Sequence, residues 1–133
     1  ANDQMAFGAM RAAQDAGKVV GRDVLFSAIN SSIPALEARI DGRLSALVGG
    51  HFSLGGWAMV LLSDDAKGID IRHLAGRDRQ VPLLQLINRV QAQHLLQHTR
   101  TRTWQVPFAR FSAQGKPATW RYPFTLKAVL DAP

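Results

Sequence analysis

The alternation of capped helical segments with short apolar segments constrains the fold of this 133-residue chain more than any other feature. Asn2 and Asp3 are favourable helix caps, and apolar residues recur at helical spacing after them until Gly17. This pattern predicts a helix over residues 3–16. The mostly apolar residues 24–29 have no helical period and predict a strand buried on both faces.

The same alternation continues through the first half of the chain. Ser31 or Ser32 can cap a helix that ends at Asp41, and residues 44–48 predict a second buried strand. A third helix is expected to begin at a Ser53 cap. Helices and strands that alternate with short links predict an α/β fold with a parallel sheet flanked by helices.

The second half of the chain is less regular. Residues 81–87 predict another strand, with Pro82 at its first position or on a sheet edge. A helix is expected from Arg89 to about residue 98. Residues 100–124 hold three prolines and most of the remaining aromatic residues, which predicts an ordered, irregular segment, and residues 125–130 predict a short final helix.

Polar side chains and glycines follow the predicted strands, at the points where the strands end. In open parallel sheets, ligands bind beyond the carboxyl ends of the strands. This rule selects three places, the first of them after a strand that would precede the chain: Asn2-Asp3, Asn30-Ser31 and Gly50-His51. Polar groups at the ends of apolar strands predict a cleft for a small molecule.

Composition and charge exclude several classes of function. The chain has no cysteine, which excludes disulfides, thiolate metal sites and cysteine nucleophiles. Residues 1–68 carry six basic and seven acidic side chains, whereas residues 69–133 carry ten and three. The basic residues are scattered and no zinc-finger or RNA-binding motif accompanies them, so nucleic-acid binding is not expected.

No pattern in the sequence predicts catalysis or a bound cofactor. His94 and His98 are one helical turn apart but lack a third ligand, so two solvated or half-buried histidines are expected. Asp64 and Asp65, near a helix end, are expected to be exposed. Trp57 is expected in core or interlobe packing. No phosphate loop or nucleophile elbow is present, and the chain is therefore not expected to be an enzyme.

Three segments of the sequence resemble a known family. "ANDQMAFGAMRAAQDAG", "DVLFSAINSSIPALEARIDGRLSALVG" and "SLGGWAMVLL" are similar, in this order, to the C-terminal half of type I periplasmic sugar-binding proteins. These are the ribose- and galactose-binding proteins and their relatives in the lactose-repressor superfamily. The resemblance covers residues 1–88 and implies part of a two-lobed fold.

The resemblance implies a set of ligand-binding residues. The Asn of the family's Asn-Asp pair binds ligand hydroxyls, which implies Asn2, with Asp3 beside it. The family's carboxylate at the end of the next strand corresponds to Asn30. The glutamine that often closes the following strand corresponds to Gly50, next to His51. An amide both donates and accepts hydrogen bonds, whereas a carboxylate at neutral pH only accepts, so Asn30 changes the preferred ligand.

The resemblance also implies where the lobes are joined. In the family the chain crosses between two lobes, and the crossings correspond to residues 49–51 and 87–89. Gly49, Gly50 and Asn88 are the implied hinge residues, because adjacent glycines absorb large changes of φ and ψ. Residues 89–133 are expected to form a C-terminal extension packed on the lobes.

The function implied is that of a periplasmic solute-binding protein without cofactors. Its ligand would be a sugar or a similar small polar molecule, and its partner a membrane permease or a sensor kinase. The alternative is the effector domain of a lactose-repressor-family transcription regulator. A small α/β hydrolase or transferase is a third possibility, for which the sequence offers no nucleophile–base pair.

The first residues, ANDQMAF, include no initiator methionine and no leader, and we expect a processed or truncated chain. The three predicted strands, residues 24–29, 44–48 and 81–87, are expected to belong to two different lobes. So few strands leave apolar edges without partners. We therefore expect the chain to associate with a second copy or with the missing N-terminal portion.

Overall fold

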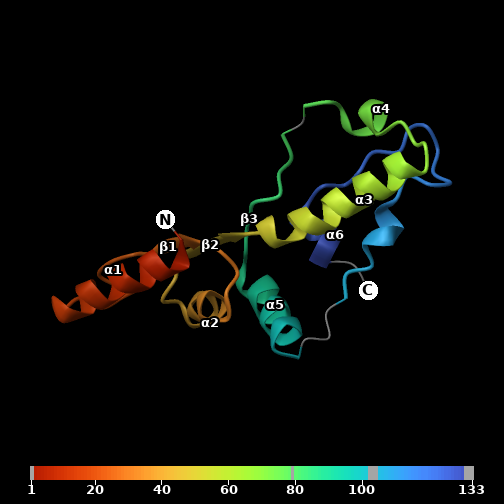
Figure 1. Ribbon diagram of the computed structural model, residues 1–133. Coiled ribbons are helices and arrows are strands. Elements are labelled where there is room, and N and C mark those ends of the chain that lie inside the picture. The colour runs from red at the N-terminus through yellow and green to blue at the C-terminus, as the bar shows by residue number, and fades with distance from the viewer. Residues whose placement is uncertain (1, 79, 102–104, 131–133) are drawn as a thin grey trace. The chain divides into compact units, whose positions relative to one another are not determined.

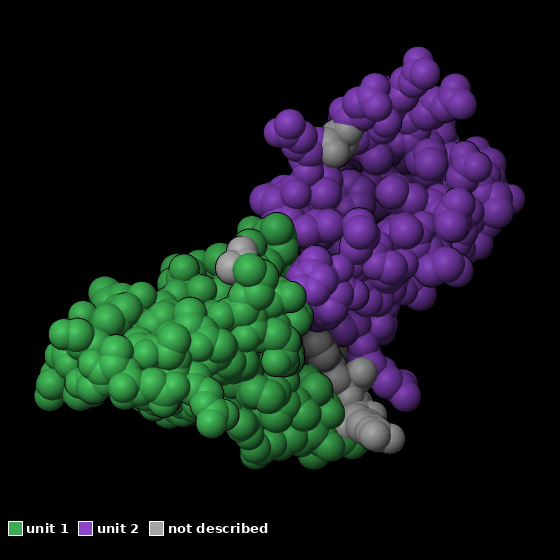
Figure 2. All heavy atoms as spheres, turned by 60° about the vertical axis from the view of Figure 1, so that its left-hand side comes forward, with its two compact units in different colours: residues 1–50, 84–104 green, residues 51–83, 105–133 purple. Residues whose placement is uncertain are grey.

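The computed structural model describes residues 2–78, 80–101 and 105–130, which form two compact units (Figures 1 and 2). Unit 1 comprises residues 1–50 and 84–104, and unit 2 comprises residues 51–83 and 105–133. The chain passes between the units after Gly50, after Leu83 and after residue 104. Among the described residues, no helix has the length and apolar character needed to cross a membrane.

Unit 1 is built on a three-stranded sheet in the order β1 (Ser27–Ile29), β2 (Ala46–Gly49) and β3 (Gln85–Leu86). Strands β1 and β2 are parallel, with Ala28 opposite Leu47. Both of these side chains are buried, but Ser27 and Ile29 on the other face of β1 are exposed, so the prediction that this strand is buried on both faces is wrong. Helix α1 (Asp3–Asp15), helix α2 (Ile33–Asp41) and helix α5 (Arg89–Thr101) complete this unit, which confirms a sheet flanked by helices (Figure 1).

Local capping interactions fix the helix ends in unit 1. The Asn2 side-chain oxygen accepts a hydrogen bond from Met5 N–H and caps α1, as predicted. The Ser32 hydroxyl caps α2, and Gly42 ends it in a left-handed conformation with φ 91°. Asn88 and Gln91 exchange backbone-to-side-chain hydrogen bonds of 3.0 and 2.9 Å. These satisfy donors that the first turn of α5 would leave unpaired.

The strands differ from the sequence-based prediction in length and in grouping. The prediction for residues 81–87 is too long, because only Gln85–Leu86 form β3. Pro82 has no N–H to donate, and Leu83 N–H donates to the Val81 carbonyl in a tight turn. Strand β3 pairs antiparallel with β2 in the same sheet. The expectation that the three strands belong to two lobes is therefore wrong.

Unit 2 contains η1 (His51–Ser53), α3 (Leu54–Ala66), α4 (Ile71–Ala75), η2 (Phe108–Phe111) and α6 (Leu126–Leu130). Its aromatic core surrounds Trp57, which is fully buried as expected. The Trp57 ring lies 5.5, 4.8 and 5.3 Å from the rings of Phe108, Phe111 and Phe124. Aromatic packing of this kind holds the irregular C-terminal segment on α3.

Two further details of unit 2 differ from the prediction. Helix α3 begins after Ser53 as expected, but the Ser53 side chain makes no capping hydrogen bond. Helix α4 is unexpected, and the Asp70 carboxylate caps it by accepting from the backbone N–H groups of Arg72 and His73, both at 3.1 Å. A five-residue helix leaves too short an apolar pattern to be recognised in the sequence.

Asp64 corrects a prediction about the acidic pair at the end of α3. Asp65 is exposed as expected, but Asp64 is fully buried. Its carboxylate accepts hydrogen bonds from Ala113 N–H at 2.7 Å, Tyr122 O–H at 2.8 Å and the Ser112 hydroxyl. Burying a carboxylate is costly unless it is hydrogen-bonded, and these donors meet that requirement. Asp64 therefore joins α3 to the C-terminal segment.

Candidate functional site

The structure brings Asn2, Asp3 and Asn30 together at the carboxyl end of the parallel strands in unit 1. Asn2 forms a parallel bridge with Ile29, the last residue of β1. The Asn30 side-chain amide donates to Asp3 Oδ1 at 3.1 Å. Asn30 N–H donates to the Val48 carbonyl at 2.9 Å, so Asn30 continues the pairing of β1 with β2. Three of the predicted site residues are therefore neighbours.

Asp3 is the buried centre of this cluster. Only 1% of the residue is exposed. Besides the Asn30 amide, its carboxylate accepts Gln4 N–H at 3.0 Å and the Ser32 hydroxyl. Burial acts to raise the pKa of the Asp3 carboxyl, but these hydrogen bonds together outweigh it and hold the pKa below its ordinary value. Asp3 is thus a charged acceptor that orients Asn30 and Ser32.

Asn30 has an unusual backbone conformation, and part of the hydrogen-bonding capacity of its side-chain amide is unused. Its φ is 152°, a region that L-residues rarely adopt. The side-chain oxygen accepts Ser31 N–H at 2.7 Å, while the nitrogen donates to Asp3. An amide has two donor hydrogens and two acceptor lone pairs, so one of each remains available. Asn30 is half-buried and can present both to a ligand.

Glycine is required for different reasons at Gly49, the last residue of β2, and at Gly50, which follows it. A Cβ on Gly49 would overlap the Ser31 hydroxyl and lie 2.6 Å from Ile87 Cδ1, so only glycine fits there. Gly50 has a φ of 123°, which also favours glycine. Gly50 is buried at the end of unit 1, and His51 is exposed at the start of unit 2. Ligand binding by Gly50 and His51, and hinge motion at Gly49, Gly50 and Asn88, stay predictions.

Two serines also lie at this edge, and one of them has a role beyond the predicted one. Ser32 was expected only as a helix cap, yet its hydroxyl also donates to Asp3. The Ser31 hydroxyl is buried and has no hydrogen-bond partner among the described residues. The sequence feature that could have indicated a polar cluster here is the run Asn30-Ser31-Ser32 after an apolar strand.

No group of three or more metal-ligating side chains occurs in the described part of the chain. His94 and His98 are half-buried, in agreement with the prediction, and their Nε2 atoms are 2.8 Å apart. One imidazole must donate and the other accept across this distance.

The cluster lies at the carboxyl end of parallel strands, which is where open α/β sheets generally bind their ligands. The chain is similar to a solved periplasmic sugar-binding protein from Pseudomonas fluorescens, with 52% identity and a TM-score of 0.89. The match covers 97% of this chain and 39% of that protein. A solved protein from Mycobacterium smegmatis matches 76% of this chain, and 32% of its own length, at 26% identity and a TM-score of 0.52.

The similarity to the Pseudomonas protein confirms the resemblance to periplasmic sugar-binding proteins, and with it the α/β fold of a periplasmic binding protein domain. The chain spans 39% of the length of the Pseudomonas protein. No protein-family model matches the chain, and no curated protein does.

Proposed function

We propose that the chain is part of a periplasmic solute-binding protein that binds a sugar or a similar small polar ligand between two lobes. The observation that carries this proposal is the position of Asn30, which is fixed by Asp3 at the carboxyl end of the parallel strands with hydrogen-bonding capacity to spare. The 52% identity to a periplasmic sugar-binding protein supports it.

The site would act by binding alone. Asn2 and Asn30 would bind ligand hydroxyls through their amides, and Gly50 would let the backbone approach the ligand closely. Asp3 would contribute mainly by orienting the Asn30 amide, because its own carboxylate is buried and already hydrogen-bonded. His51, which follows Gly50 in the chain, would be a further binding residue. Nothing in this arrangement activates a nucleophile, and no cofactor is required.

Ligand binding would be transmitted by closure of the lobes. Gly49 and Gly50 would serve as hinge residues, since one passage of the chain between the units follows Gly50. Asn88 would be a further hinge residue on the resemblance alone, because the second passage follows Leu83 and Asn88 lies inside unit 1. The closed state would be recognised by a membrane permease of an ABC transporter or by a sensor kinase. The alternative of a repressor effector domain is not favoured, because the 52%-identical protein is a periplasmic binding protein.

Calorimetric titration of the full-length protein that carries this chain tests the proposal. The titrants are pentoses, hexoses and cyclic polyols, with glycine and acetate as small polar controls. We expect saturable binding of at least one sugar or polyol with one site per protein. Absence of binding to every sugar and polyol in the series, together with saturable binding of a control, would refute the proposed ligand class.

A further inference from the structure

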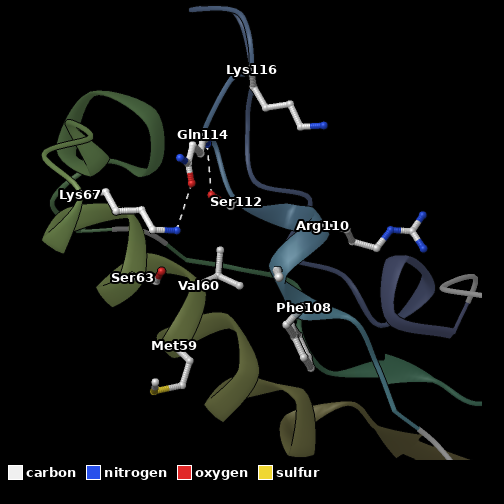
Figure 3. A pocket seen from close by; sticks show the side chains of 10 residues that line it. Met59, Val60, Ser63, Lys67, Phe108, Arg110, Ser112, Gln114 and Lys116 are labelled. Carbon is white, nitrogen blue, oxygen red and sulfur yellow. Dashed lines mark hydrogen bonds between the residues drawn. The ribbon is translucent and has the colours of Figure 1, made fainter.

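Unit 2 contains a pocket that the proposed sugar site does not use. It has a volume of about 570 Å³. It lies between α3 and the segment that contains η2 and the residues following η2 (Figure 3). This volume is within the usual range of small-molecule sites. All of its lining residues belong to unit 2, whereas Asn2, Asp3 and Asn30 belong to unit 1.

One part of the pocket wall is apolar. Met59, Val60 and Phe108 line it, and all three are labelled in Figure 3. The Phe108 ring packs edge-on against Trp57, which fixes its position in the wall. Met59 is 65% exposed although it is a large apolar side chain. An apolar ligand group placed here would remove this surface from water.

The remaining wall carries three cations and no described acidic residue. Lys67 lies on the side of α3, and Arg110 and Lys116 lie on the side of the C-terminal segment (Figure 3). Within the described residues, none of the three forms a salt bridge. The Lys67 ammonium donates to the Gln114 side-chain oxygen at 3.1 Å, a neutral partner that leaves its charge in place.

Aromatic rings and hydrogen bonds position these cations. The Arg110 guanidinium lies 5.4 Å from the centre of the Phe111 ring, and the Lys116 ammonium lies 5.1 Å from the Trp120 ring. Rings of this kind hold a cation without neutralising it. The charge of Asp64 acts on Lys67, but its carboxylate is buried beneath the wall and is already hydrogen-bonded. The pocket therefore keeps an excess of positive charge.

We propose that this pocket binds a small organic anion, a carboxylate or a phosphate ester that carries an apolar group. The apolar group would pack on Met59, Val60 and Phe108. The anionic group would be bound by Arg110 and Lys116, whose side chains extend to the same side in Figure 3. An arginine fork and an ammonium group match the oxygens of a carboxylate or a phosphate.

Phenyl phosphate is a suitable probe because it combines a planar apolar group with a dianion. Calorimetry on the full-length protein that carries this chain compares it with inorganic phosphate and with neutral benzyl alcohol. We expect phenyl phosphate to bind saturably at millimolar or lower concentration, at least about tenfold more tightly than either control. Its affinity should fall as salt concentration rises.

Two variants with matched changes of charge test whether phenyl phosphate binds in this pocket. The double variant R110Q/K116Q should weaken phenyl phosphate binding about tenfold or more. The control K18Q/R72Q removes the same charge from two exposed positions outside the pocket and should change affinity less than about twofold. Equal losses in both variants, absence of saturable binding, or binding of inorganic phosphate as tight as that of phenyl phosphate would each overturn the proposal. Circular dichroism confirms that both variants are folded.

Discussion

Asp3 is a carboxylate whose hydrogen bonds link three separate parts of unit 1. It lies in the first turn of α1, and it accepts hydrogen bonds from Asn30 after β1 and from Ser32 before α2. Because Asp3 is buried, water does not readily take the place of its carboxylate as the acceptor for these donors. The cluster therefore fixes both the fold at this edge and the direction of the Asn30 amide.

We expect Asp3→Ala to lower the free energy of unfolding by about 1–3 kcal/mol, because it leaves the Asn30 and Ser32 donors without their acceptor. Asp3→Asn should cost less, since the amide oxygen can still accept one of them. Urea unfolding followed by circular dichroism measures both. The matched control is Asp15→Ala, which changes an exposed acid in the same helix. Equal stability of the Asp3→Ala and Asp15→Ala variants would contradict the role of Asp3.

At the level of single elements, α3 contains two adjacent glycines in different surroundings. Nothing lies within 4 Å of a Cβ placed on Gly55, whereas a Cβ on Gly56 would overlap the Phe108 ring. Gly56 thus allows Phe108 to pack closely on the helix. Gly55 has no such packing role and only lowers the stability of the helix.

This difference predicts opposite effects of the same substitution. Gly55→Ala should stabilise the protein by about 0.5–1 kcal/mol, because alanine is the better helix former. Gly56→Ala should destabilise it by about 1–3 kcal/mol, because the Phe108 ring must move off Trp57. Thermal unfolding of the two variants measures the difference. A rise in melting temperature for Gly56→Ala as large as that for Gly55→Ala would show that Phe108 does not pack there.

The Asp64 contact predicts a pH-dependent stability of α3 and the C-terminal segment. Burial acts to raise the pKa of the Asp64 carboxyl, but its hydrogen bonds from Ser112, Ala113 and Tyr122 hold the pKa below its ordinary value of 3.8. A carboxyl whose pKa is lowered by folding stabilises the fold above its unfolded-state pKa. That contribution is lost as the pH falls through the folded-state pKa.

Asp64→Asn should therefore reduce the free energy of unfolding by about 1–3 kcal/mol at pH 7, and by progressively less as the pH falls below 3.8. Urea unfolding at several pH values, followed by tryptophan fluorescence, tests this. Its control is Asp65→Asn, an exposed neighbour that should change stability little at any pH. A loss of stability from Asp64→Asn that is the same at pH 7 and pH 3 would rule out an ionised Asp64.

The sequence predicted the elements whose signals are local. The caps of α1 and α2, the glycine after α2 and the apolar residues of β1 and β2 are all decided within a few residues. The contacts of Asp64 were not predictable, because its donors are 48 to 58 positions away in the chain. The Asp3 cluster was predicted in position but not in role, since its partners are 27 and 29 positions away.

At the scale of the whole chain, unit 1 leaves apolar side chains exposed around a small sheet. Strand β3 has two residues and its outer side carries no described strand. The exposed apolar residues of this unit are Met5, Val19, Leu25, Ile29, Leu84, Leu86 and Val90. An unpaired strand edge beside apolar side chains favours pairing with another chain.

We expect the isolated 133-residue chain to self-associate at micromolar concentrations. Sedimentation velocity over a dilution series should show a species larger than 14.6 kDa whose fraction falls on dilution. Leu86→Lys should reduce that fraction, because a charge on the exposed edge strand opposes strand pairing. A monomer at all concentrations would contradict the expectation.

The most direct test of the proposed function is sugar binding by the Asn30→Ala variant of the full-length protein. Calorimetry with the sugar or polyol that the wild-type protein binds should show a loss of about 1–3 kcal/mol, or roughly five- to 150-fold in Kd. Gln93→Ala, an exposed amide on α5, should leave the affinity unchanged. Wild-type affinity in a folded Asn30→Ala variant would contradict the assignment of the ligand site to the carboxyl end of the parallel strands.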